Sequence, residues 1–551
     1  MDKSKSQIAE FLSRHGAKLA LGFVIVLVLF VRVRLRETPL ERDEGEYAYA
    51  GQLMLQGIPP YKLAYNMKLP GTYAAYALIM AVFGQTDSGI HIGLALVNLA
   101  TIVMIYFMGR RVLDATAGGA AALAYGLLST SSAFLGLAGH ATHFVVFCAM
   151  AGVLLLLKAR ETEKPALFFA SGVMFGGAFL MKQHGVFFGV FGLGYVLWQN
   201  LVKVEKNWQR CWRESGCLLG GLMLPFAFTC AALAALGVFK PFWFWTFTYA
   251  KEYAAAISFD QLPAILRAAV ESSVGLNAIF WVLAAVGAVM MWWEKRLRAA
   301  LPFVTGFAIA GILALCAGMY FRHHYFILLL PVVALLNGVV VSRALFLIRN
   351  EKSVELFLAL GGLVLYGLAV LVAIAMHGEE WFSATPVKVS ESTYHYNLFS
   401  ETRRLAMDLR AESPGNARVV VVGSEPQIYF YSHRHSASGY IYTYALMEAH
   451  PYAVKMQDEM IREIETARPE YAVYVSDPTS WAQREDSEKK IFRWWEGYWG
   501  EHYELLRSIP VMRERVAGQN LRDASAPNQN TGIIMVLKRK DVVAAPKKSA
   551  Q

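Results

Sequence analysis

Two adjacent carboxylates, Asp43 and Glu44, stand at the start of a stretch with helical spacing that continues through Leu55. Acidic residues at a helix start cap free amides and complement the helix dipole, and this is the role expected for Glu41 and Glu46. An acid that faces a substrate can instead take a proton from an attacking hydroxyl group. Asp43 and Glu44 are therefore candidate acid–base residues, provided that the fold gathers other polar groups around them.

Three further clusters of polar residues could supply those groups. Each cluster stands at an end of a long apolar run, and all of them fall on one predicted side of a membrane. Singly, such a histidine can be a satisfied polar residue at the interface, and such a cation can extend toward lipid headgroups. Acids beside fixed cations at one aqueous surface instead suit a reaction whose substrate carries phosphate. The clusters are His140 and His143; Lys182, Gln183 and His184; and Arg322, His323, His324 and Tyr325.

The elements that must position these residues are apolar helices. The chain has 551 residues, of which 56% are hydrophobic and only 17% are charged, so it is too apolar for an ordinary soluble enzyme. A helix needs roughly 20 apolar residues to cross about 30 Å of hydrocarbon. We predict a polytopic α-helical membrane protein with about eleven transmembrane helices. The predicted spans lie near residues 17–33, 88–108, 116–138, 141–157, 166–181, 185–202, 216–237, 273–293, 301–320, 325–342 and 354–376.

The distribution of positive charge predicts the orientation of these spans. With a cytoplasmic N-terminus, most Lys and Arg residues fall in cytoplasmic turns, as the positive-inside rule requires. Arg32, Arg34, Arg36 and Arg42 oppose this orientation, because they follow the first span on the outer side. The cytoplasmic turns account for most of the net charge of +10, so we expect a lipid bilayer and no nucleic acid as a partner. All five cysteines lie in or beside the apolar part, so neither a disulfide nor a cysteine metal site is expected.

Two domains follow from this pattern. Residues 1–376 form the predicted transmembrane catalytic domain, with its first outer loop at 34–87, and residues 377–551 form a small C-terminal α/β domain. Eleven spans place both the loop and this tail on the extracytoplasmic side of a cell inner (plasma) membrane. In the tail, strand-like runs at 418–423 and 471–475 flank a helical stretch near 451–467, and residues 423–426 are expected to form a plain turn. Four aromatic residues could stack on sugar rings or pack on the membrane domain: Trp494, Trp495, Tyr498 and Trp499.

Several segments together resemble the GT-C glycosyltransferases. They are Asp43-Glu44, Lys68-Leu69-Pro70, and Arg322-His323-His324-Tyr325-Phe326 leading into Leu330-Pro331. Within this superfamily the chain is similar to the protein mannosyltransferase and lipid A aminoarabinose transferase group, particularly its bacterial mannosyltransferase-like members. Residues 141–144 and 179–185 strengthen the likeness, which covers about residues 42–341.

The resemblance implies a GT-C-like fold and specific residue roles. Asp43 would be the catalytic base, and Glu44 would support it or the acceptor. Lys68 would face the donor phosphate, although Leu69 stands where the family has the first proline of its Lys-Pro-Pro turn. Arg322 would contact phosphate near the membrane edge. The family's donor is a polyprenyl-phosphate sugar, and its reaction inverts the anomeric centre.

The chemistry of the residues suits the same donor. No glycine-rich nucleotide loop stands out, and the candidate site faces away from the cytoplasm, where nucleotide sugars are made. A lipid-borne sugar would sit just above the membrane, where Asp43 could take the proton of a hydroxyl-bearing acceptor during a single displacement. The transition state would resemble an oxocarbenium ion, while Lys68, Lys182 and Arg322 would stabilise the departing phosphate.

By the same reasoning, a metal ion could bind at the site but is not required for the reaction. His140 and His143 are three residues apart, so they would share one helical face and could ligate a divalent metal with Asp43 or Glu44. Because the leaving group is a monophosphate that is already held by cations, no metal or other cofactor is obligatory.

Two other functions fit the same topology. A transporter or flippase for a lipid-linked sugar would use similar cations, and a polymerase would join lipid-linked oligosaccharides on the same face. Transporters usually show repeated halves and charges at mid-membrane, whereas these charges sit at span ends and no internal repeat is evident. The sequence therefore favours a transferase.

Overall fold

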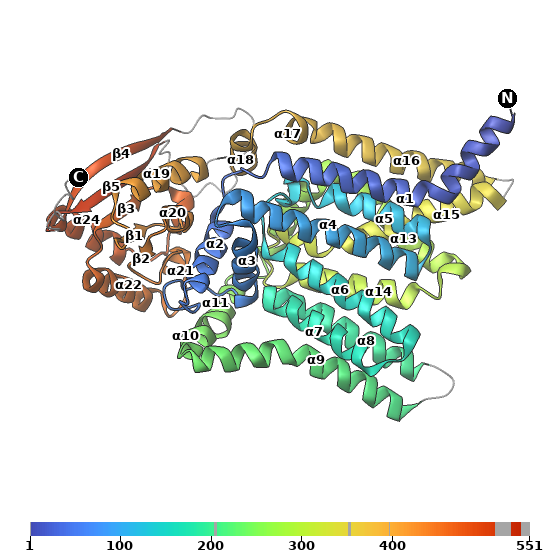
Figure 1. The fold of residues 1–551 in the computed structure, drawn as a ribbon, viewed down its shortest axis with the longest axis horizontal. Coiled ribbons are helices and arrows are strands. Elements are labelled where there is room, and N and C mark those ends of the chain that lie inside the picture. Colours follow the sequence, from blue (N-terminus) through green and yellow to red (C-terminus); the bar gives the residue numbers. More distant parts are fainter. Residues whose placement is uncertain (1, 203–206, 351–353, 396, 513–530, 542–551) are drawn as a thin grey trace, which may run out of the picture.

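The structure, a computed structural model, describes residues 2–202, 207–350, 354–395, 397–512 and 531–541. A bundle of long helices forms one part of the molecule, and a five-stranded sheet with its helices forms the other (Figure 1). Helices α2 (Arg42–Leu55) and α3 (Pro70–Phe83) run across the ends of the bundle helices, between the bundle and the sheet (Figure 1). The first outer loop therefore lies at the junction of the two parts.

Each of the eleven predicted spans contains one helix: α1, α4 to α9, or α13 to α16. Among the described residues, six of these helices are long and apolar enough to cross a membrane, and the bent pair α12–α13 would make a seventh. By length and composition these helices suit a multi-pass membrane protein, and the number of eleven spans remains a prediction. The bounds are α1 (Asp2–Arg34), α4 (Asp87–Val112), α5 (Ala115–Leu128), α6 (Ala141–Thr162), α7 (Pro165–Met181), α8 (Val186–Leu201), α9 (Trp208–Ala235), α10 (Phe239–Trp243), α11 (Ala250–Ala255), α12 (Leu262–Val274), α13 (Ala278–Trp293), α14 (Leu301–Cys316), α15 (Leu330–Asn350) and α16 (Val354–Met376).

One predicted span is much shorter in the structure. The apolar run at 116–138 forms a helix only as far as Leu128, because hydroxyl side chains follow it. Thr130 Oγ1 donates to the carbonyl of Gly126 at 2.9 Å, and Ser131 Oγ accepts from the Ala133 amide at 3.2 Å. Such local bonds compete with the helical ladder. The residues between Leu128 and His140 therefore form turns and one short 3-10 helix, Ser132–Phe134, rather than a continued α-helix.

The two helices of the first outer loop begin where the sequence predicts. Glu41 caps α2 through a capping box with Glu44, and Pro70 occupies the first turn of α3, where its missing amide costs nothing. Most of the apolar face of α2 does not reach the surface of the protein. Tyr47 and Leu53 are buried in one hydrophobic cluster with residues of α3 and of the sheet domain, because that domain covers the helix.

Two glycines allow the close approaches that assemble this junction. A Cβ atom at Gly45 of α2 would lie 2.6 Å from Cβ of Gln427 in the sheet domain. A Cβ atom at Gly71 of α3 would lie 2.4 Å from the carbonyl oxygen of Leu180, near the end of α7. Only glycine fits at either position, so α2 lies directly against the tail and α3 directly against the bundle.

The tail is a small α/β unit, as predicted, with strand order β2-β1-β3-β5-β4. Its first three strands are parallel, and β5 pairs antiparallel with both β3 and β4. Alternate residues of β1 face opposite sides: Val419 and Val421 join the cluster that contains α2, whereas Val420 and Val422 join the cluster that contains α22. The bounds are α17 (Gly378–Phe382), α18 (Pro386–Tyr394), α19 (Phe399–Glu412), β1 (Arg418–Val422), α20 (Gln427–Ser432), β2 (His435–Ser436), α21 (Tyr444–Met447), α22 (Ala453–Ala467), β3 (Tyr471–Val475), α23 (Pro478–Trp481), α24 (Lys490–His502), β4 (Tyr503–Met512) and β5 (Thr531–Arg539).

A buried arginine joins the tail to α2. Arg42 Nη2 lies 2.6 Å from Glu425 Oε1, and the side chains are 8% and 0% exposed. Its other nitrogens donate to the Ser424 carbonyl at 2.5 Å and to the Tyr444 hydroxyl at 2.9 Å. Residues 423–426 were expected to form a plain turn, but their acid is the ion-pair partner of the residue next to Asp43.

Two more of the outer arginines have buried structural partners. Arg32 donates to Asn98 at 3.1 Å and to the Gly136 carbonyl at 2.8 Å. Arg34 donates to three backbone carbonyls in residues 380–384. These arginines hold folded segments together, which accounts for the positive charge that follows the first apolar helix.

Breaking the Arg42–Glu425 pair should loosen the tail. Arg42→Met leaves a buried carboxylate without its partner, which costs about 3–5 kcal/mol, whereas Arg36→Met at the exposed pair with Glu37 should cost about 0–1 kcal/mol. Limited proteolysis of the tail across a denaturant series, in mild detergent, measures the difference. Equal losses for the two variants would show that the buried pair does not hold the tail.

Candidate functional site

The candidate site is centred on three charged side chains that contact one another. Lys68 Nζ lies 2.7 Å from Asp43 Oδ1 and 2.7 Å from Glu46 Oε2. Lys68 comes from the segment before α3, and the Tyr61 hydroxyl donates to its carbonyl at 2.7 Å. The ammonium group also lies 4.6 Å from the centre of the Tyr47 ring. The lysine thus fixes the carboxylate of Asp43 at the first turn of α2.

Glu46 is a member of this site that the sequence reasoning missed. It was expected to cap α2, but its side chain is fully buried and accepts from Lys68, from the Tyr73 hydroxyl at 2.6 Å and from Asn66 at 2.8 Å. Its three-residue spacing from Asp43 was the available signal, because that spacing puts both acids on one helical face.

Glu44 binds two other elements of the protein. Its Oε1 accepts from the Gly139 amide at 2.5 Å and lies 3.0 Å from His91 Nε2 of α4, while Oε2 accepts from the Glu41 amide at 3.3 Å. Because Gly139 directly precedes His140, this carboxylate holds the segment that carries His140 next to α2.

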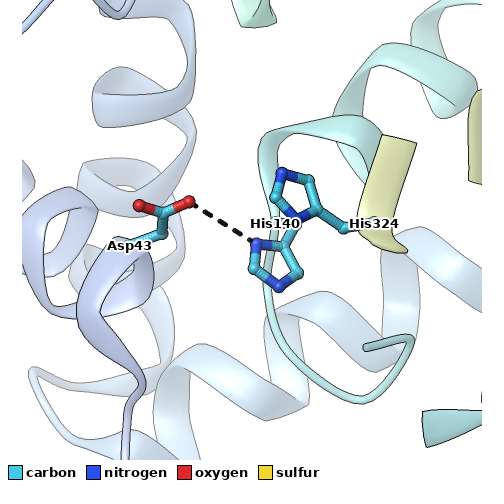
Figure 2. A group of neighbouring side chains, drawn as sticks. All are labelled: Asp43, His140 and His324. Carbon is cyan, nitrogen blue, oxygen red and sulfur yellow. Dashed lines mark ion pairs between the residues drawn. The ribbon is translucent and has the colours of Figure 1, made fainter. Parts of the chain in front are cut away.

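Two histidines from separate elements stack beside Asp43. Figure 2 shows Asp43 pointing toward His140, whose ring lies against that of His324. The ring centres are 4.1 Å apart with an interplanar angle of 9°, and His140 Nδ1 lies 3.9 Å from Asp43 Oδ2. Neither ring nitrogen of His140 has a hydrogen-bond partner among the described residues, although the side chain is buried. His143 lies deeper in α6 and is buried as well, outside this group.

Lys182 is the second cation of the site. Its Nζ lies 3.7 Å from the centre of the Tyr325 ring, which also contacts His184 and His324 edge to face. Gln183 is its neighbour in sequence but has a structural role, since it donates to the Met67 carbonyl at 2.9 Å.

Arg322 is the third cation and lies on the exposed side of the cluster. Its guanidinium carbon is 5.5 Å from the centre of the Tyr320 ring. Across the described ranges, neither Arg322 nor Lys182 has an acidic side chain within ion-pair distance. His323 does not join the cluster, because its Nε2 lies 3.2 Å from Ser272 Oγ on α12.

The surroundings shift the proton affinities of these groups. Burial alone would raise the pKa of Asp43, but the charge of Lys68 and its hydrogen bond to the carboxylate hold that pKa well below its ordinary value. Burial lowers the pKa of His140 to about 4, although Asp43 opposes the shift. Burial, reinforced by the charges of Lys68 and Arg322, lowers the pKa of Lys182 to about 7. At neutral pH the site therefore contains an ionised carboxylate, a neutral imidazole and a lysine that is about half protonated.

The tail contributes directly to this site. The Tyr442 hydroxyl lies 3.4 Å from Asp43 Oδ1, and the Tyr442 ring centre is 5.5 Å from Lys68 Nζ. No sequence signal marks Tyr442, because it lies in an irregular segment far from Asp43 along the chain. The site consequently includes residues of both parts of the protein.

Comparison with known proteins bears on this arrangement. A family model described as dolichyl-phosphate-mannose-protein mannosyltransferase matches residues 68–245, which include Lys68, His140 and Lys182. The structure of ArnT from Cupriavidus metallidurans bound to undecaprenyl phosphate matches with a TM-score of 0.59 at 14% identity, over 95% of this chain and 98% of that chain. The apo state of the same protein gives 0.54 over the same shares. A search of curated proteins gives no significant match.

A third structure matches less closely. The oligosaccharyltransferase of Archaeoglobus fulgidus, tethered with an acceptor peptide, gives a TM-score of 0.50 at 13% identity, over 84% of this chain and 69% of that chain. At these identities the likeness establishes the fold alone, which this chain shares with the ArnT and oligosaccharyltransferase structures. The resemblance noted in the sequence is thereby confirmed.

In the part of the chain that the structure describes, one group of side chains could hold a metal ion, and it lies in this site. The ligand atoms of Asp43, His140 and His324 lie within 4.8 Å of one another, so His324 takes the place expected for His143. A zinc ion binds nitrogen or oxygen at about 2.0–2.2 Å, along lone pairs that lie in the plane of each imidazole. Nearly parallel stacked rings do not aim their lone pairs at one point. One ring must rotate before both could bind the same ion.

We therefore expect the purified protein to retain no stoichiometric metal. Dialysis against EDTA should leave its unfolding temperature unchanged, and elemental analysis should find less than one transition-metal ion per chain. One ion per chain that is lost in His140→Ala and His324→Ala, yet kept in the control His323→Ala, would establish a metal site.

Proposed function

We propose that this chain is an inverting glycosyltransferase that moves a sugar from a polyprenyl-phosphate donor to an acceptor hydroxyl group. The observation that carries the proposal is an ionised carboxylate, Asp43, beside two cations that have no acidic partner among the described side chains. Those cations stand at the ends of apolar helices, where the phosphate of a membrane lipid would lie.

Lys182 and Arg322 are proposed to bind the donor phosphate. Lys68 already contacts two carboxylates, so it would have to release one of them to reach a phosphate. We assign Lys68 mainly to holding Asp43. The proposal of a lipid donor is supported by the fold, because the related ArnT structure is bound to undecaprenyl phosphate.

Asp43 is proposed to receive the acceptor proton. Its low pKa makes it a weak base, but a hydroxyl group becomes strongly acidic once its oxygen bonds to an oxocarbenium-like carbon. The new bond forms between acceptor oxygen and anomeric carbon, the bond from that carbon to the phosphate oxygen breaks, and the electron pair leaves with the phosphate. Attack from the face opposite the phosphate inverts the centre.

The surrounding polar groups are proposed to orient the sugar. His140 and His324 offer neutral rings beside Asp43, and Tyr325 is packed between His324 and Lys182. His184 contacts Tyr325 and is held by the Ala314 carbonyl at 2.8 Å. These groups can donate or accept hydrogen bonds from sugar hydroxyls. His143, His323 and Gln183 would support the residues that contact the sugar without contacting it themselves.

The remaining features of the proposal concern substrate and topology. The family model favours mannose as a candidate sugar, and the acceptor would be a glycan, a lipid or a protein.

The site and the tail, residues 377–551, would lie on the extracytoplasmic face of the inner membrane, beyond the catalytic domain of residues 1–376. A transporter would need no base for a hydroxyl proton, so the placement of Asp43 beside Lys68 and His140 favours a transferase over a transporter. A polymerase would use the same base, with a lipid-linked glycan as its acceptor.

Asp43→Asn tests the proposal directly. The amide keeps the shape of the side chain but removes its basicity, so sugar transfer from a defined lipid-linked monosaccharide should fall by about 10² to 10⁴ fold. Donor-lipid binding should persist, because Lys182 and Arg322 are unchanged. Product analysis by mass spectrometry measures the transfer.

The matched control is Asp408→Asn, the same change at a half-exposed acid of the tail that pairs with Arg507. It should transfer at the parental rate. Transfer by Asp43→Asn at that same rate would remove Asp43 as the base.

Donor binding should also depend on pH through Lys182. Its lowered pKa of about 7 means that it is charged below pH 7 and must take up a proton to bind phosphate above pH 7. Donor affinity should therefore weaken as the pH rises from 7 to 9, by up to about tenfold per pH unit, since one proton is coupled. The donor, a phosphodiester, does not titrate in this range.

Lys182→Arg should flatten that profile, because a guanidinium group stays charged throughout. Lys388→Arg, at an exposed ion pair with Glu379, provides the same change away from the site and should keep the parental profile. Parallel profiles for the parent and Lys182→Arg would exclude Lys182 as the titrating group.

A further inference from the structure

A second polar hollow lies in the tail, far from Asp43. It is an open depression of about 530 Å³ formed by residues of α22, α24 and the end of β5. Figure 1 shows α24 at the end of the tail opposite the helix bundle, whereas α2 lies beside the bundle. The volume falls in the range of about 300–1,000 Å³ that is usual for small-molecule sites.

Two aromatic rings line this hollow. Trp494 and Tyr498 are one turn apart on α24, their ring centres are 4.7 Å apart, and both are partly exposed. Trp495 faces the other way, is buried, and stacks on Tyr474 of β3. Trp495 builds the core of the tail, whereas Trp494 and Tyr498 stack on each other and line the hollow, so each ring can offer its outer face to a ligand.

Hydrogen-bonding groups surround these rings and fix them. Trp494 Nε1 donates to Glu465 Oε1 at 2.8 Å, and Arg539 Nη1 donates to the Tyr498 hydroxyl at 3.2 Å. Asp541 joins Arg468 at 2.8 Å and Arg539 at 2.6 Å. The rings are thus held in place before any ligand binds, which reduces the entropy lost on binding.

We propose that this hollow is a carbohydrate-binding site, separate from the transfer site, that takes a neutral oligosaccharide. Fixed aromatic faces can stack on the C–H face of a pyranose ring, and the surrounding carboxylates and guanidinium groups can bond its hydroxyls. The lining acids Glu465 and Glu501 offset the charges of the lining residues Arg468 and Arg539, both of which also pair with Asp541. This balance disfavours nucleic acids and polyphosphates, and the polar rim disfavours an acyl chain.

Gly497 provides a way to fill the hollow without disturbing the fold. It lines the hollow on α24, and a Cβ atom added there would meet nothing within 4 Å. Gln has a better helix propensity than Gly, so Gly497→Gln should keep the helix while its side chain covers the aromatic surface. Gly500 is equally open, lies on the same helix and does not line the hollow, so Gly500→Gln is the matched control.

The experiment uses the full-length protein in detergent, with no lipid donor present. The probes are three neutral hexasaccharides, of α-linked mannose, α-linked glucose and β-linked glucose, titrated by tryptophan fluorescence and by saturation-transfer NMR. At least one should bind to the parent. Gly497→Gln and Trp494→Ala should weaken it by about tenfold or more, while Gly500→Gln and Trp499→Ala bind as the parent does.

Two outcomes would overturn the proposal. One is that none of the three oligosaccharides binds to the parent protein. The other is that Gly497→Gln binds as well as Gly500→Gln, because the sugar would then occupy a different place. Neither outcome depends on the transfer assay, so the carbohydrate-binding site and the proposed function are tested independently.

Discussion

The guanidinium group of Arg42 is buried, and a buried charge must be paired and fully hydrogen-bonded if the fold is to tolerate it. All of its partners, Ser424, Glu425 and Tyr444, belong to the tail. The helix that carries Asp43 can therefore form its native contacts only when the tail has docked on it. Docking in turn brings Tyr442 within 3.4 Å of Asp43. One ion pair thus couples the folding of the tail to the completion of the site.

The cations of the junction fall into two groups with different electrostatic roles. Arg42 and Lys68 lie 2.6–2.7 Å from carboxylates, so their charges are already neutralised by ion pairs within the protein. Lys182 and Arg322 rest on tyrosine rings, which attract a cation far less strongly than a carboxylate does. A ligand phosphate can bind such weakly held cations without first displacing a carboxylate from them. This contrast, rather than the mere abundance of positive charge, identifies the side on which an anion should bind.

The sequence predicted the elements well and their contacts poorly, for identifiable reasons. Apolar runs and period-2 strands are local patterns, so each of the eleven predicted spans contains a helix, although the one at 116–138 ends at Leu128, and the strands β1 and β3 lie where expected. Lys68 and His140, which lie beside Asp43, were also predicted, because they stand at the ends of such elements, whereas nothing in the sequence marks Tyr442. Glu46 and Glu425 were misassigned, since helix starts and turns usually use acids locally, and only the fold supplies Lys68 and Arg42 as partners. Likewise, the stacking of His140 on His324 depends on how two distant segments meet.

Charge balance gives a further reason for the composition of the site. The cluster contains three cations, Lys68, Lys182 and Arg322, and two carboxylates, Asp43 and Glu46. A polyprenyl-phosphate sugar carries one negative charge, so the fully ionised site becomes neutral when this donor binds. During transfer the phosphate gains a negative charge while Asp43 gains a proton, and the site remains neutral. Because a net charge is costly in a poorly solvated site, both states are favoured by the same side chains. An enzyme without Asp43 at this position would develop an unbalanced charge as the phosphate leaves, which is the physical reason that the base and the phosphate-binding cations must share one cluster.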